Sequence, residues 1–191
     1  MKCNPDNGII LLFLLLLQIN IFAQGNNVRF ENLTSEDGLS QNSVIKIYQD
    51  SKGFLWFGTF DGLDRYDGYK FKVYKHDNED STSISGNYFD AVCEDKYGNL
   101  WIGSNRGLNK YDPGKDTFKN YKHIPGNKYS LSSNYILAIF KDKRNNLWIG
   151  TKDGLDLFDY KNDRFIGFKN DPKNHNSLSS NYIISIGARE S

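Results

Sequence analysis

One nine-residue pattern occurs three times along the chain and constrains its fold more than any other feature. The first copy, at residues 56–64, reads Trp-Phe-Gly-Thr-Phe-Asp-Gly-Leu-Asp, and the pattern returns at residues 101–109 and 148–156. The copies begin 45 and then 47 residues apart. A period of about 20–50 residues is typical of repeat architectures, in which each copy is one supersecondary unit.

A second marker keeps the same spacing. The sequence Leu-Ser-x-Asn, or Ile-Ser-x-Asn in one unit, occurs four times in steps of 45, 47 and 47 residues, ending at Asn42, Asn87, Asn134 and Asn181. The shorter first step maps to one turn, because Phe71 follows Tyr66 by five residues whereas Phe118 follows Tyr111 by seven. The agreement of two independent markers establishes the repeat.

Each unit alternates apolar and polar residues with a period of two, which is typical of β-strands. In the third unit, strands are expected at residues 135–141, 147–151, 155–160 and 164–169. The Asp-Gly pairs at 61–62 and 153–154 predict tight hairpins. Four short antiparallel strands per unit are typical of a β-propeller blade. The sequence therefore predicts an all-β fold with three four-stranded antiparallel blades and a partial fourth, an incomplete propeller arc, with the blades at residues 44–74, 88–121 and 135–168.

The chain opens with the features of a secretory signal peptide. Lys2 precedes an unbroken apolar run at residues 9–17, and a small residue follows at Ala23. A membrane-spanning helix needs about 20 apolar residues, so this run is too short to cross a bilayer. We therefore predict a signal peptide at residues 1–23 and an exported chain, with an uncut membrane anchor as the alternative. Export would leave Cys93 without a disulfide partner.

The charge balance excludes one class of partner. The chain has 24 Lys and Arg against 23 Asp and Glu, a net charge of +1, so it lacks the basic surface that nucleic-acid binding requires. Aromatic residues make up 15% of the chain, whereas disordered chains are poor in them. We expect membrane contact only through the signal segment or through a C-terminal part beyond this sequence.

The Trp-Ile-Gly-Thr-x-Asp-Gly-Leu core, together with the Leu-Ser-Ser-Asn marker, resembles the two-component regulator propeller repeat. The resemblance covers about residues 28–186. It implies the periplasmic sensor region of a hybrid two-component system, a family best known from gut Bacteroides. In that family the propellers are seven-bladed and often paired. They are followed by a β-sandwich, one membrane helix and a histidine kinase, usually with response-regulator and helix-turn-helix domains.

The chain departs from this family in length. Seven blades of about 46 residues need roughly 300 residues, and the chain has 191. The fourth unit opens normally at residues 178–186, but the tail at residues 187–191 leaves the pattern. We interpret the chain as an N-terminal fragment from a truncated or frame-shifted gene, with a natural short protein as the alternative. Residues 24–43 are expected to hold a linker and an N-terminal closing strand around Phe30.

The recurring Trp and Gly residues are predicted to be structural. Each Trp could stack on a sugar ring, but its identical place in every unit favours packing between neighbouring blades. We therefore expect all three Trp side chains to be well buried at equivalent positions. The structural positions are Trp56, Trp101, Trp148, Gly58, Gly103, Gly150, Gly62, Gly107 and Gly154.

The sequence holds no pattern that indicates catalysis, a metal ion or a cofactor. His76 and His123 occupy one repeat position, one per blade, whereas a metal site needs three or four converging donors. Cys93 stands where the other units have Tyr48 and Phe140, which favours a core residue over a nucleophile. The motifs G-x-S-x-G and H-E-x-x-H and the phosphate-binding Gly-rich loop do not occur. We predict a chain that is not an enzyme and uses no cofactor.

Ligand contacts are expected on the rim, because recognition on a repeated scaffold is usually built from loops. The connections that vary between units are residues 75–84, 122–131 and 170–178. The hairpin tips lie beside them in each unit. The candidate ligand-binding residues at these tips are Asp61, Arg106 and Asp153.

Three functions from different classes remain open. The first is part of a periplasmic ligand sensor, with carbohydrate as the ligand class that the family implies. The second is a protein-interaction module, and the third is an exported propeller enzyme, such as a lyase or an oxidoreductase. The enzyme would need an acid–base or cofactor constellation on the rim, which the sequence does not show. Three blades leave an apolar blade face uncovered at each end, so we also expect self-association.

Overall fold

The computed structural model describes residues 30–188 of the 191-residue chain. The predicted signal peptide, its cleavage point and the last three residues of the off-pattern tail lie outside the described residues. No helix in the described part is long and apolar enough to cross a membrane. Residues 30–34 belong to no strand, and a short 3-10 turn, η2, follows at Ser35–Asp37. The closing strand stays a prediction.

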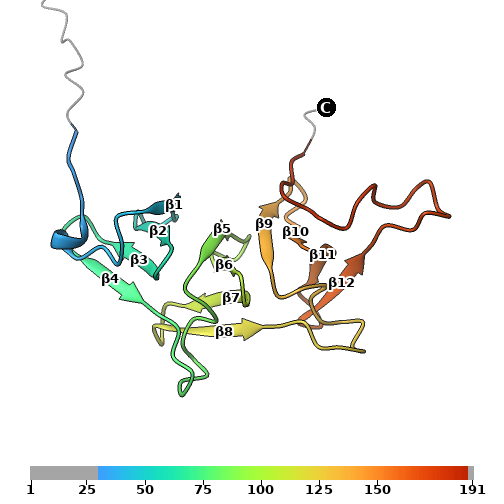
Figure 1. Ribbon diagram of the computed structural model, residues 1–191, viewed down its shortest axis with the longest axis horizontal. Helices are drawn as coiled ribbons and strands as arrows, with labels where there is room; N and C mark the ends of the chain where they lie inside the picture. The colour runs from blue at the N-terminus through green and yellow to red at the C-terminus, as the bar shows by residue number, and fades with distance from the viewer. Residues whose placement is uncertain (1–29, 189–191) are drawn as a thin grey trace, which may run out of the picture. The chain divides into compact units, whose positions relative to one another are not determined.

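Three four-stranded antiparallel sheets follow η2, each with its strands in sequence order across the sheet (Figure 1). We call them blades 1, 2 and 3. The predicted all-β fold is confirmed, and between residues 30 and 188 there is no α-helix. Blade 1 holds β1 (Val44–Gln49), β2 (Leu55–Thr59), β3 (Leu63–Tyr66) and β4 (Phe71–Tyr74). Blade 2 holds β5 (Phe89–Glu94), β6 (Leu100–Ser104), β7 (Gly107–Asp112) and β8 (Thr117–Tyr121). Blade 3 holds β9 (Ile136–Lys141), β10 (Leu147–Thr151), β11 (Gly154–Asp159) and β12 (Arg164–Phe168).

The register of the strands repeats from blade to blade. Trp56 lies opposite Tyr48, Trp101 lies opposite Cys93, and Trp148 lies opposite Phe140. A bulge interrupts the pairing of the first two strands of every blade near its start. Equivalent residues therefore point the same way in each blade, as the sequence spacing predicts.

Two apolar cores join the blades. The first is built from the Trp56 side of blade 1 and the facing side of blade 2, which carries Val92 and Ile102. The second is built from the Trp101 side of blade 2 and the facing side of blade 3, which carries Ile149 and Phe158. Each blade thus offers two different faces, which we call the Trp face and the receiving face, and the Trp face packs on the receiving face of the next blade.

A Gly in each second strand allows the next blade to approach closely. A Cβ added at Gly58 would lie 2.7 Å from the carbonyl oxygen of Phe89, and one at Gly103 would lie 2.5 Å from Cγ2 of Ile136. At Gly150, the same atom would lie 2.8 Å from Cγ2 of Ile183. Contacts this short do not occur between a Cβ and a fixed neighbour, so only Gly fits these three positions.

The first residues of the fourth unit also pack closely over a Gly of the preceding blade, although they form no regular strand. Ile183 packs over Gly150, and its backbone N–H donates to the carbonyl oxygen of Thr151 at 3.0 Å. Asn181 accepts a backbone hydrogen bond of 2.8 Å from Gly154. This segment therefore lies on blade 3 where the first strand of a following blade belongs.

The burial of the tryptophans is confirmed for two of them and wrong for the third. Trp56 and Trp101 are 1% and 0% exposed, but Trp148 is only half-buried. The reason is that Trp148 lies on the Trp face of blade 3, and residues 178–188 cover only part of that face. Phe168, on the last strand of blade 3, is likewise 40% exposed.

Candidate ligand-binding rim

The candidate rim is the end of the blades that carries the second hairpin of each sheet and the connections to the next blade. Each hairpin tip is closed by a hydroxyl, because Thr59, Ser104 and Thr151 each donate to the carbonyl oxygen of a Gly three residues later at 2.9 Å. These glycines have φ values of +153°, +142° and +143°, a conformation that favours Gly. They are the predicted structural positions Gly62, Gly107 and Gly154.

The Ser of the second marker fastens the connection to the blade. In blade 3, the backbone N–H and the hydroxyl of Ser132 both donate to the Asp156 carboxylate, at 2.9 Å and 2.7 Å. Ser40 makes the same pair of bonds to Asp64. In blade 2, the backbone N–H of Ser85 donates to the Asn109 side chain at 2.8 Å. The last residue of the nine-residue pattern is therefore a structural acceptor.

Burial shapes the electrostatics of these acceptors. Desolvation raises the pKa of Asp156 above its ordinary value, although the hydrogen bonds from Ser132 oppose it. The pKa of Asp64 is raised for the same reason, against the hydrogen bonds from Ser40. Both carboxyls are fully buried and engaged within the fold, so a ligand on the rim does not reach them.

Two histidines hold the connections between blades in place through hydrogen bonds. The Asn87 side chain accepts from the His76 backbone N–H at 2.7 Å, while His76 Nδ1 donates to the Ile84 carbonyl oxygen at 2.9 Å. His123 makes the equivalent bonds to Asn134 and Leu131. In the third unit this position is Asn170, which bonds Asn181 and Leu178 instead. Sequence reasoning identified the shared position of the histidines but missed this role, for which the spacing to the Asn marker was the available signal.

The three predicted site residues lie on three separate tips, and no hydrogen bond or ion pair joins any two of them in the described structure. Asp61 forms an ion pair of 2.7 Å with Lys75, and Asp153 forms one of 2.6 Å with Lys169. Arg106 differs, because its side chain forms no ion pair or hydrogen bond with another residue among residues 30–188. All three tips are solvent-accessible, so each can contact a ligand.

An open hollow lies on the connection between blades 2 and 3. Its volume is about 370 Å³, large enough for one sugar unit. Apolar surface makes up more of its lining than polar surface, and Lys169, the partner of Asp153, is one of its lining residues. The lining residues are His123, Gly126, Asn127, Lys128, Ser130, Leu131, Ser132, Gly167 and Lys169.

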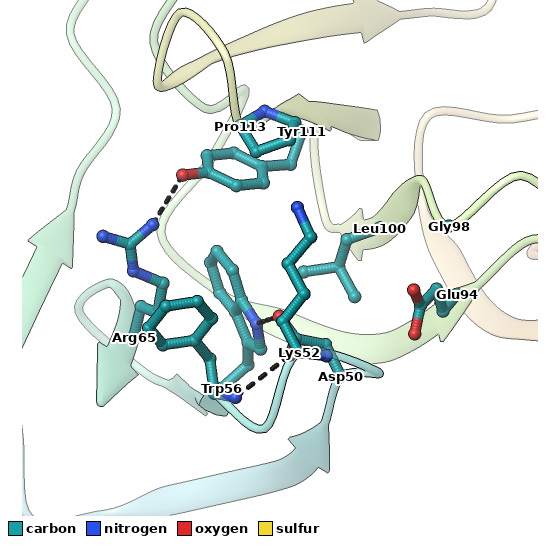
Figure 2. Close-up of a pocket in the computed structure, with 10 residues that line it drawn as sticks. Asp50, Lys52, Trp56, Arg65, Glu94, Gly98, Leu100, Tyr111 and Pro113 are labelled. Atoms are coloured by element: carbon teal, nitrogen blue, oxygen red, sulfur yellow. Dashed lines mark hydrogen bonds between the residues drawn. The ribbon is translucent and has the colours of Figure 1, made fainter. Parts of the chain in front are cut away.

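A smaller cavity lies at the seam between blades 1 and 2, near the turns at the other end of the strands (Figure 2). There the Arg65 guanidinium donates to the Tyr111 hydroxyl at 2.7 Å, and the Trp56 indole donates to Asp50 at 2.8 Å. The cavity holds about 40 Å³, which is room for a few water molecules. Its size and its internal bonds make it part of the seam between the blades rather than a saccharide site.

The described residues contain no group of three or more His, Cys, Asp or Glu side chains placed to hold a metal ion. Cys93 is half-buried against the second core. Burial raises the pKa of its thiol, which leaves little of the nucleophilic thiolate at neutral pH.

The repeats of this chain match a known protein family. The family model described as "Two component regulator propeller" matches residues 38–61, 83–106 and 130–153, which run in each unit from the second marker to the hairpin tip. Histidine kinase P4 of Formosa agariphila is 55% identical over 69 residues, which are 36% of this chain and 5% of that protein.

Two solved structures from B. thetaiotaomicron share the fold. The extracellular domain of BT3049, assigned as a hybrid two component system, is 32% identical with a TM-score of 0.72 over 81% of this chain and 22% of that one. The extracellular domain of BT4673, assigned as a one component system, is 24% identical with a TM-score of 0.66 over 83% and 21%. This chain thus spans about a fifth of the length of these solved chains. Its blades are built from the repeats of the two component regulator propeller family.

Proposed function

We propose that this chain is the N-terminal part of a periplasmic sensor of a hybrid two-component system, that it binds carbohydrate, and that it carries out no catalytic step. The observation that carries the proposal is the match of all three blades to the regulator propeller repeat, together with 32% identity to an extracellular domain of a protein assigned as a hybrid two component system. The likeness to a histidine kinase supports the link to phosphotransfer signalling.

The rim supports carbohydrate as the ligand. The hollow at the connection between blades 2 and 3 presents amide, hydroxyl, imidazole and ammonium groups, which suit the hydroxyls of a sugar. The side chains that shape this region are locked by hydrogen bonds to the loop backbone, as with His123 on Leu131. A site built in this way loses little conformational entropy when a ligand binds.

A binding experiment tests the proposal. The chain is expressed with its own N-terminus, purified from the periplasmic fraction and titrated calorimetrically with neutral and acidic oligosaccharides. We expect saturable binding of at least one of them, weakened by Lys128→Ala in the hollow. The matched control is Lys143→Ala, since Lys143 is an exposed lysine on the turn between β9 and β10. Binding of no saccharide, or reproducible turnover of one, would contradict the proposal, as would retention of the chain in the cytoplasm.

A further inference from the structure

The ion pair at the hairpin tip is a repeated feature of the blades, and blade 2 breaks it. In blades 1 and 3, the residue before the tip Gly is an Asp, and it binds the Lys that follows the last strand, as Asp61 binds Lys75 and Asp153 binds Lys169. In blade 2 the Lys is kept as Lys122, but the Asp is replaced by Arg106. The tip of blade 2 therefore carries two positive charges where its neighbours carry a neutralised pair.

The backbone holds these two residues in the same relation as the ion-paired residues. Leu108 pairs with Tyr121 as Leu155 pairs with Phe168, so the register beside the tip is the same in blades 2 and 3. A Cβ at Gly107 would lie 3.5 Å from Cγ of Lys122, which places the lysine stem against the hairpin. Arg106 and Lys122 are both exposed, and neither forms an ion pair with a carboxylate of residues 30–188.

The neighbouring connection is shaped to fit this tip. Gly86 stands where the next two units have Ser133 and Ser180. A Cβ there would lie 2.9 Å from Oδ1 of Asn105 and 3.4 Å from Cβ of Arg106. The missing side chain lets the loop backbone lie directly against the base of Arg106 and the side chain of Asn105.

We propose that Arg106 and Lys122 form a site for an anionic group, a carboxylate or a sulfate, carried by an acidic saccharide. A guanidinium presents two parallel N–H donors that match either group, and the adjacent ammonium adds a second charge. The anionic group of the ligand takes the position that the carboxylates of Asp61 and Asp153 fill in the other blades. This assignment rests on the proposed carbohydrate-sensing function and specifies the charge of the ligand.

Reversal of one charge tests the site without damage to the fold. Arg106→Asp recreates at blade 2 the ion pair of blades 1 and 3, so the variant should melt at the temperature of the native chain. The probes are tri-galacturonic acid, a sulfated galactose trisaccharide and its neutral counterpart. We expect the native chain to prefer the acidic probes, with affinity that falls as salt rises. Arg106→Asp should weaken acidic binding about tenfold. Arg106→Lys keeps the charge but loses the two parallel donors, so its affinity should lie between those of the native chain and Arg106→Asp.

A gain of function provides the matched control. Asp153→Arg places two cations beside each other at the tip of blade 3, with Lys169 as the second. The variant should bind the acidic probes at a second, weaker site, because Ser133 stands beside this tip in place of Gly86. Equal affinity of native chain and Arg106→Asp for the acidic probes would overturn the inference, as would equal binding of acidic and neutral probes.

Inorganic sulfate separates this inference from the proposed function. Binding of sulfate is followed through the NMR signal of the Arg106 Nε–H group. A shift on sulfate addition that Lys122→Ala removes, with no saccharide bound, would support the anion site and refute carbohydrate sensing. Neutral saccharide binding that Arg106→Asp leaves unchanged, with no shift on sulfate addition, would refute the anion site and support the sensor.

Discussion

The indole Nε1 of Trp101 donates a hydrogen bond of 2.8 Å to Oδ2 of Asp95, six residues earlier in the same blade. The same bond joins Trp56 to Asp50 at 2.8 Å and Trp148 to Asp142 at 3.0 Å. The turn between the first two strands is thereby tied to the residue that fills the seam between blades. This pairing explains why the Asp turn and the Trp recur together.

We predict that Asp95→Ala destabilises the chain by about 2–4 kcal/mol, because the indole of Trp101 and the amides of Tyr97 and Asn99 lose a charged acceptor. The matched variant is Asp142→Ala. Its cost should be smaller, since Trp148 is half-buried and water can accept the hydrogen bond from its indole N–H. Urea unfolding measures both, and equal losses would show that burial of the Trp does not set the cost.

Acid should weaken the same turns. Burial by itself raises the pKa of Asp142, but the hydrogen bonds from Trp148, Asn146 and the turn backbone outweigh it and lower the pKa to about 2. The folded pKa lies below the unfolded value of 3.8, so the stabilisation is present above pH 3.8 and is lost as the pH falls through about 2. Asp142→Asn should therefore flatten the melting temperature between about pH 4 and pH 2. An unchanged acid profile would contradict this prediction.

Asp156 should behave in the opposite sense. Its folded pKa is raised, so its contribution is fully present below the unfolded pKa and is lost as the pH rises through the folded pKa. Asp156→Asn copies Asn109 of blade 2 and should be neutral or stabilising at pH 7, by up to about 1 kcal/mol. Asp156→Ala leaves both donors of Ser132 unpaired and should cost about 2–3 kcal/mol. Denaturant curves at pH 4 and pH 7 check the sign, and a destabilising Asp156→Asn at pH 7 would refute it.

Gly103→Ala should open the seam between blades 2 and 3. The new methyl group would lie 2.5 Å from Cγ2 of Ile136, and we expect a loss of about 1–3 kcal/mol from the forced displacement. Gly187→Ala serves as the control, since no atom lies within 4 Å of a Cβ at that position. Thermal melting of both variants tests the prediction, and a Gly103→Ala chain as stable as the control would contradict it.

The purified chain should self-associate through the receiving face of blade 1 and the Trp face of blade 3. Ile47 pairs with Phe57 as Val92 pairs with Ile102, yet Ile47 is 59% exposed and Val92 only 6%. A second copy can bury this face as blade 1 buries the receiving face of blade 2, gaining about 1.5–3 kcal/mol for each large apolar side chain.

Ile47→Lys should reduce the apparent mass measured by light scattering at micromolar concentration. Ile124→Lys is the matched control, because Ile124 is 54% exposed on a connecting loop. A native chain that stays monomeric, or equal effects of the two substitutions, would count against self-association through these faces.

The sequence alone determined the repeat, the strands and the packing role of two tryptophans. The period-two alternation, the Asp-Gly turns and the two equally spaced markers are local properties of the sequence. They predict the blades because each strand forms its hydrogen bonds with the strand next to it in the sequence. The fixed spacing also predicted that Arg106 occupies the position of Asp61 and Asp153.

Only the tertiary structure decided how these positions interact. Three of these interactions join residues 8 to 24 positions apart in the sequence. They are the ion pair of Asp153 with Lys169 and the hydrogen bonds from His123 to Leu131 and from Ser132 to Asp156. The partial exposure of Trp148 likewise depends on what covers the outer face of its blade. Burial and charge pairing are set by neighbours in space, and a pattern that repeats identically along the chain does not report which copy has such a neighbour.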